Sequence, residues 1–96
     1  MAYTGMNAAV VERIARDLQT CATRLTTAVN GVDSIVTRTQ TYWVGADATK
    51  FASQWRTDRT TLTSLSSSIS SLSRTASNQA AEQRRISAAL AAAKNN

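Results

Sequence analysis

Apolar residues in the first half of the chain recur at alternating steps of three and four, which is typical of the a and d positions of a heptad helix. The series has one polar member and consists of Val11, Ile14, Leu18, Cys21, Leu25, Ala28, Val32, Ile35, Thr39 and Tyr42. A second line, one residue per heptad, runs directly beside it and consists of Ala8, Ala15, Ala22, Val29, Val36 and Trp43. Together they form an apolar stripe wide enough for a helix that touches more than one neighbour.

The second half carries the same pattern in a new phase. Its members are Phe51, Trp55, Asp58, Leu62, Leu65, Ile69, Leu72, Ala76, Gln79, Gln83, Ile86, Leu90 and Ala93. Residues 60–73 contain no charge and are mostly Ser and Thr, a composition that also suits a flexible linker. The regular spacing of the leucines favours a helix, which packing must hold because Ser and Thr are mediocre helix formers.

The two heptad series do not join, because Tyr42 and Phe51 are nine residues apart. Gly45 lies in this gap and can adopt positive φ, and Asn7 and Asp47 are suitable N-caps. We therefore predict an all-α fold, an antiparallel two-helix hairpin in a single domain over residues 1–96. Its helices span about residues 7–42 and 47–90, its turn about 43–46, and its tail is frayed to residue 96.

A lone hairpin leaves half of a wide apolar stripe in water, so we predict an obligate partner and dimerisation into a four-helix bundle. The predicted dimer and hairpin core consists of Val11, Ile14, Leu18, Leu25, Val32, Ile35, Phe51, Trp55, Leu62, Leu65, Ile69 and Leu72. Cys21, between Leu18 and Leu25, is predicted to be a small buried hydrophobe.

The composition of the chain favours a protein that acts by binding a partner over an enzyme or a metalloprotein. The chain has no histidine and one cysteine, and its six carboxylates show no pairing on one helix face, so we predict no metal site, no cofactor and no enzyme. No apolar run is long enough for a membrane span, and Glu12, Arg13 and Arg16 stand where a signal peptide needs its apolar stretch. The net charge of +5 suits an acidic partner but is not diagnostic of nucleic acid.

Trp43, Val44 and Gly45 form a W-x-G at mid-chain, between two heptad-patterned helices. Ala46 and Ala48 follow, and Phe51 and Trp55 open the second helix. With these features the chain resembles, over essentially its whole length, the WXG-motif family, the small Esx-like (ESAT-type) proteins of type VII secretion systems.

The resemblance implies a helical hairpin that pairs with itself or with a related WXG-motif protein. It also implies a secretion motor ATPase as a partner, and export from the cytoplasm without a cleavable signal peptide, in a virulence-associated family. Trp43 and Gly45 would form the turn and recognition motif, although Trp43 could instead be purely structural. The alternatives are a basic helical protein that binds nucleic acid or an acidic partner, although nucleic acid is not expected, and a cytosolic chaperone for a larger toxin.

Many members of the family carry Tyr-x-x-x-Asp/Glu near the C-terminus as part of an export signal, and this chain has no tyrosine after Tyr42. The candidate replacement contains Asn78, Gln79, Gln83, Ile86 and Leu90. A partner chain that supplies the tyrosine motif is one alternative. Another is that Gln79 and Gln83 are core residues that set the register of the dimer.

Overall fold

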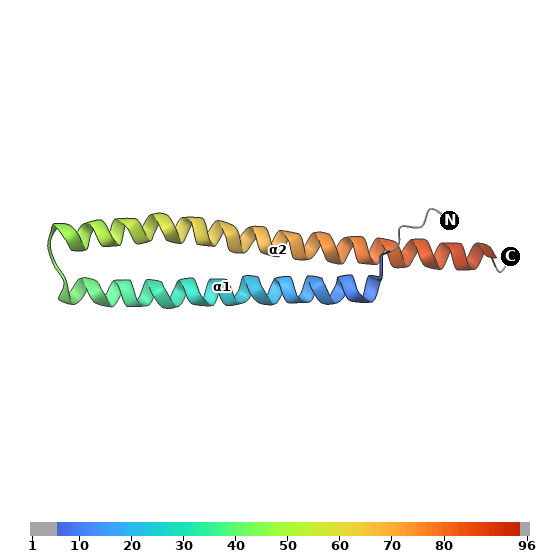
Figure 1. Cartoon of the computed structure of the whole chain (residues 1–96), viewed down its shortest axis with the longest axis horizontal. Coiled ribbons are helices and arrows are strands. Elements are labelled where there is room, and N and C mark those ends of the chain that lie inside the picture. The colour runs from blue at the N-terminus through green and yellow to red at the C-terminus, as the bar shows by residue number, and fades with distance from the viewer. Residues whose placement is uncertain (1–5, 95–96) are drawn as a thin grey trace.

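The computed structural model describes residues 6–94, so residues 1–5 and 95–96 of the predicted domain lie outside it. The described residues form two helices, α1 (Ala8–Tyr42) followed by α2 (Ala46–Lys94). They lie side by side and antiparallel, joined by a short turn, with overall dimensions of 77 × 18 × 13 Å (Figure 1). The chain is therefore all-α and a helical hairpin, as its heptad pattern predicts.

The helix ends follow local chemistry. The side chain of Asn7 caps α1 by accepting a hydrogen bond from the backbone N–H of Val10 at 3.2 Å. Asp47, expected as the N-cap of the second helix, lies instead within its first turn. A carboxylate there interacts favourably with the positive end of the helix dipole. The carbonyl oxygen of Gly45 accepts a hydrogen bond from the backbone N–H of Thr49 at 3.0 Å. Helix α2 therefore begins at Ala46, one residue before Asp47.

The hairpin core consists of small side chains at heptad spacing. On α1 the buried residues are Ala15, Ala22, Val29 and Val36, and on α2 they are Ala48, Ala52, Ser66, Ser73 and Ala80. We call Ala15, Ala22, Val29 and Val36 on α1, with Ala52, Ser66, Ser73 and Ala80 on α2, the seam residues. Because these side chains are short, the two helix backbones approach closely.

Two serines join the helices across the seam. The hydroxyl of Ser66 donates to the carbonyl oxygen of Ala22 at 2.9 Å, and that of Ser73 donates to the carbonyl oxygen of Ala15 at 2.6 Å. Ser66 also shares a hydrogen bond with the hydroxyl of Thr26 at 2.8 Å. These contacts satisfy the buried hydroxyls and set which residues of α1 and α2 lie at the same level.

Helix α2 has 49 residues and α1 has 35, so the C-terminal end of α2 projects beyond the start of α1 (Figure 1). This overhang continues to Lys94, past the end near residue 90 that the sequence predicts. Within residues 6–94 no helix is long and apolar enough to cross a membrane.

Candidate functional site

The exposed apolar side chains of the hairpin gather on one face. On α1, the side chains that immediately precede the seam residues Ala15, Ala22 and Val36 are those of Ile14, Cys21 and Ile35, respectively. On α2, the side chains that immediately precede Ala52, Ser66 and Ser73 are those of Phe51, Leu65 and Leu72. Because the two helices run in opposite directions, the same offset on each helix places these side chains on the same face. We call this surface, which also includes Ala28 and Tyr42, the apolar face.

The predicted core residues border or form this face rather than the buried seam. Val11, Leu18, Leu25, Trp55, Leu62 and Ile69 are half-buried, and Ile14, Val32, Ile35, Phe51, Leu65 and Leu72 are exposed. Leu65 is 49% and Leu72 57% exposed, although both belong to the most regular leucine series of the chain. Their place in a dimer core stays a prediction, since the hairpin alone does not bury them.

Cys21 was expected to be buried and is exposed. The reason is that α2 contacts the neighbouring heptad line, through Ala22, and leaves the line of Cys21 on the apolar face. Sequence reasoning also missed the seam of α2, because Ser66 and Ser73 are polar and show no hydrophobic periodicity. Their spacing of seven, the same as that of the alanines on α1, is the pattern that could have identified them.

The opposite face of the hairpin is polar and carries ion pairs between the helices. Arg84 binds Glu12 through two hydrogen bonds, of 2.6 and 3.2 Å. The hydrogen bond from Arg84 lowers the pKa of the Glu12 carboxyl below its ordinary value, and the charges of Arg84 and Arg16 add to this effect. Within α2, the contact with Arg85 lowers the pKa of Glu82 in the same way.

One polar cluster lies where Arg59 takes a seam position. A carboxylate oxygen of Asp33 accepts a hydrogen bond from the indole N–H of Trp55 at 3.0 Å and another from Arg59 at 3.3 Å. Trp55 and Arg59 of α2 are thus both joined to Asp33 of α1 by hydrogen bonds. Asp58, a polar member of the second heptad series, accepts a hydrogen bond from the side-chain amide of Gln54 at 3.0 Å.

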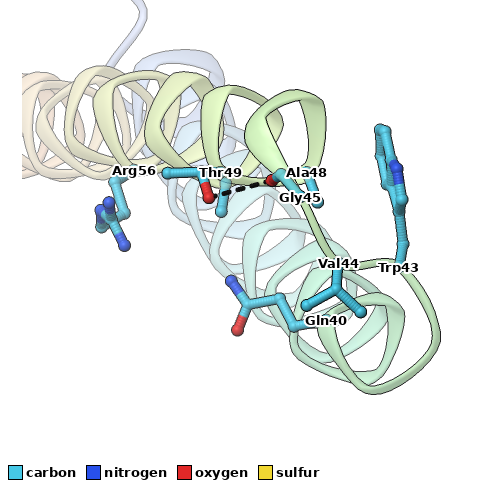
Figure 2. Close-up of a pocket in the computed structure, with 8 residues that line it drawn as sticks. Gln40, Trp43, Val44, Gly45, Ala48, Thr49 and Arg56 are labelled. Atoms are coloured by element: carbon cyan, nitrogen blue, oxygen red, sulfur yellow. Dashed lines mark hydrogen bonds between the residues drawn. The ribbon is translucent and has the colours of Figure 1, made fainter.

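The turn presents the W-x-G residues at one end of the molecule. Trp43 caps α1 in an extended conformation, and its backbone N–H donates to the carbonyl oxygen of Thr39 at 2.9 Å. Gly45 has φ +123°, the positive value that its position predicts. A shallow pocket of about 280 Å³ lies at this end, and Figure 2 shows the Trp43 indole on the side away from Gln40 and Arg56.

Trp43 is anchored but not buried. Its ring lies 5.4 Å from that of Phe51, centroid to centroid, in a tilted arrangement, and the residue is 40% exposed. Val44, beside it, is 87% exposed. The indole is therefore held in position by Phe51 while one surface remains accessible.

The candidate export segment lies along α2 toward the overhang. Asn78 and Gln79 are exposed, and Gln83 is half-buried and donates to the hydroxyl of Ser87 at 3.3 Å. Ile86 and Leu90 are 41% and 61% exposed on the last turns of α2. None of the described residues, 6–94, forms a group of His, Cys, Asp and Glu able to hold a metal ion.

Replacing Gly45 with alanine is expected to lower the free energy of unfolding by about 1–3 kcal/mol, because an L side chain is strained at this φ. The matched control is Gly31→Ala, in the interior of α1, where an added Cβ meets nothing within 4 Å. That change should stabilise the helix by about 0.5–1 kcal/mol. Urea denaturation followed by circular dichroism measures both, and equal effects of the same sign would contradict a special role for Gly45.

Comparison with known proteins yields one family. The sequence model of the WXG100 family, whose members are described as proteins of 100 residues with WXG, matches residues 4–86 of this chain. No curated protein and no solved structure matches.

Proposed function

This chain belongs to the WXG100 family, and on that premise we propose that it is a small substrate or adaptor of a type VII secretion system that acts by pairing with a second helical hairpin. WXG100 proteins are small, helical and linked to type VII secretion, they pair with each other, and they are not known as enzymes. The proposal extends these family properties to a specific role for this chain.

The observation that carries the proposal is the apolar face. Large hydrophobic side chains from both helices are exposed along it, whereas the hairpin seam buries only Ala, Val and Ser. A continuous exposed apolar surface of this kind marks a protein-interaction site. A second hairpin with a similar face would cover it and complete a four-helix bundle.

Two other features fit the export role. Trp43 stands partly exposed at one end of the hairpin, and the α2 overhang presents Ile86 and Leu90 at the other. An amphipathic helical segment with unpartnered apolar residues is a common docking element for a protein groove. In this proposal the secretion motor ATPase binds the overhang, and the protein leaves the cytoplasm without a cleavable signal peptide.

Export is expected to depend on the secretion motor. An immunoblot of culture filtrate should detect the chain in the native host and lose it in a strain that lacks the motor ATPase. A cytoplasmic marker protein controls for lysis. Retention in the cytoplasm of both strains would contradict the export role and leave a cytosolic binding protein, such as a chaperone for a larger toxin.

Trp43→Ala is expected to abolish most export while leaving the hairpin folded. The substitution removes one aromatic contact, with Phe51, which is worth about 0.5–1.5 kcal/mol. Val44→Ala is the matched control, because Val44 is adjacent and almost fully exposed. Export is measured by immunoblot and folding by circular dichroism, and unfolding of the Trp43 variant would show that the indole is structural rather than a recognition element.

A further inference from the structure

We propose that the polar side of the hairpin, opposite the apolar face, binds the headgroups of an anionic lipid bilayer, by charge and without insertion into it. The surface is defined from the seam lines, which repeat every seven residues through Ala15 on α1 and Ser73 on α2. We call the positions one, four and five residues after each position of these lines, together with Arg59, the polar face. A partner hairpin on the apolar face leaves the polar face exposed, so its role is separate from the pairing in the proposed function.

Two observations confirm that these positions share one side of the hairpin. Glu12 and Arg84, each four residues after an alanine of a seam line, form an ion pair between the helices. Gln19 and Thr23 of α1 line a shallow groove of about 190 Å³ together with Ser70 of α2. The same offset from the seam therefore leads to the same side on both helices, as it does for the apolar face.

The polar face offers no apolar anchor for a protein partner. From Ala9 on α1 to Ala92 on α2, it contains no aliphatic side chain larger than alanine and no aromatic side chain. Protein interfaces generally depend on a core of buried apolar or aromatic side chains. A layer of hydrated, charged headgroups needs no such core, so it fits this face better than a folded protein does.

Charge is divided unequally between the two sides of the molecule. Of the 11 basic residues of the chain, all except Arg24, Arg38 and Lys94 lie on the polar face. Of the six acidic residues, only Glu12 and Asp33 lie there. The polar face therefore holds more than the whole net charge of +5, and the opposite side is slightly acidic. A molecule polarised in this way turns its polar face toward a negative surface.

Much of this positive charge is not neutralised within the hairpin. Both carboxylates of the face are already bound by arginines, Arg84 and Arg59. Within the part of the chain that the structure describes, Arg16, Arg56 and Arg74 form no ion pair. Arg56 and Arg74 donate only to serine hydroxyls of the preceding turn, at 3.1 and 3.0 Å. These three guanidinium groups are therefore available to bind phosphate oxygens.

Two of the unpaired arginines lie at the same level of the hairpin. Ser73 donates a hydrogen bond to the carbonyl oxygen of Ala15 at 2.6 Å, and Arg74 and Arg16 are the residues that follow these two. Both side chains therefore extend from the same side of the molecule at the same height. Neighbouring positive charges repel one another, and a phosphate group bound beside them relieves that repulsion.

The basic residues form a row along a narrow molecule. The hairpin measures 77 × 18 × 13 Å, and its two helices run along the longest dimension (Figure 1). Arg56, Arg74 and Arg84 follow one side of α2 over about 42 Å, at about 1.5 Å per residue. A planar bilayer meets such a row along its full length. The phosphates of a nucleic-acid duplex wind around an axis with a turn of about 34 Å, so they meet a straight row only at intervals.

Adsorption is tested by centrifuging the purified full chain with lipid vesicles. Vesicles with equal parts of phosphatidylcholine and phosphatidylglycerol should carry the protein into the pellet, whereas vesicles of phosphatidylcholine alone should not. Binding should fall steeply between about 0.1 M and 1 M salt, because the Debye length shrinks from about 10 to about 3 Å. No binding, equal binding to both kinds of vesicle, or binding that ignores salt would overturn the proposal.

A triple variant tests the unpaired arginines of the polar face. Arg16→Gln/Arg56→Gln/Arg74→Gln should lower the ratio of bound to free protein by about a hundredfold, since each basic residue near an anionic surface contributes about fivefold. Glutamine has a helix propensity close to that of arginine, and circular dichroism verifies that the variant is folded.

The matched control removes the same charge from outside the polar face. Arg24→Gln/Arg38→Gln/Lys94→Gln has the same net charge as the first triple variant, but it should bind the anionic vesicles within about fivefold of the native chain. Equal losses in the two variants would show that net charge alone governs adsorption, and would overturn the polar face as the binding surface.

Two further measurements separate this mode of binding from others. A dye trapped in the anionic vesicles should stay inside, and its release would show that apolar side chains insert, against adsorption by charge. A labelled DNA duplex should bind more weakly than the anionic vesicles at the same salt. Tighter binding to the duplex would assign the polar face to nucleic acid instead. Motor-dependent export is measured separately, so failure of these tests would leave the proposed function standing.

Discussion

Replacing Leu65 with aspartate is expected to dissociate the assembly of hairpins and to lower its thermal midpoint. Leu65 lies on the apolar face, 49% exposed in the hairpin, and a partner that covers this face would enclose its side chain. Enclosing a carboxylate without a partner costs several kcal/mol, so the dissociation constant should rise by about a thousandfold or more.

Stability should fall together with association. No large side chain of residues 6–94 is fully buried in the hairpin, whose seam consists of Ala, Val and Ser, so the isolated hairpin has little apolar burial to offset the loss of chain entropy. Sedimentation equilibrium and circular dichroism melts measure the two effects. Ser67→Asp is the matched control, since Ser67 is an exposed residue of the same helix, away from the apolar face. An unchanged melt and mass for Leu65→Asp would argue against a bundle built on this face.

Ala22→Leu is expected to destabilise the hairpin itself, by about 3 kcal/mol. Ala22 is only 1% exposed, and its carbonyl oxygen accepts the hydrogen bond from Ser66. A leucine at this position forces the helices apart and breaks that bond. The contact between Ser66 and Thr26 is then weakened as well.

The control for this substitution is Ala81→Leu, on an exposed position of α2 where a leucine has space. Because Ala and Leu have similar helix propensities, the difference between the two variants reports the seam and not the helix. Urea denaturation followed by circular dichroism measures it. Equal midpoints for the two variants would contradict a seam that depends on small side chains.

Much of the architecture was predictable because local physical chemistry determines it. The heptad spacing predicts two helices, and the phase shift between Tyr42 and Phe51 predicts the break that Gly45 occupies. Gly45 adopts the positive φ expected at such a turn, and Asn7 caps the first helix. The W-x-G at mid-chain, with Phe51 and Trp55 after it, is enough to indicate the family that the comparison with known proteins supports.

The polar contacts between the helices were not predictable. Trp55, Asp33 and Arg59 meet because α2 returns beside α1 at one particular level, and no local pattern places Asp33 opposite Trp55. The pairing of Glu12 with Arg84 joins residues near opposite ends of the chain for the same reason. Such contacts depend on the register of the hairpin, which the seam sets.

By itself the sequence determined the two helices, the place of the turn, and an apolar stripe too wide for one neighbour. Only the tertiary structure decided which part of that stripe forms the seam. Adjacent heptad lines have the same period, so periodicity cannot tell the line of Ala22 from the line of Cys21. The close approach of the two backbones distinguishes these lines, because only small residues fit between the helices. It also lets Ser66 and Ser73 donate hydrogen bonds to the facing helix. The larger side chains are thereby left on the apolar face.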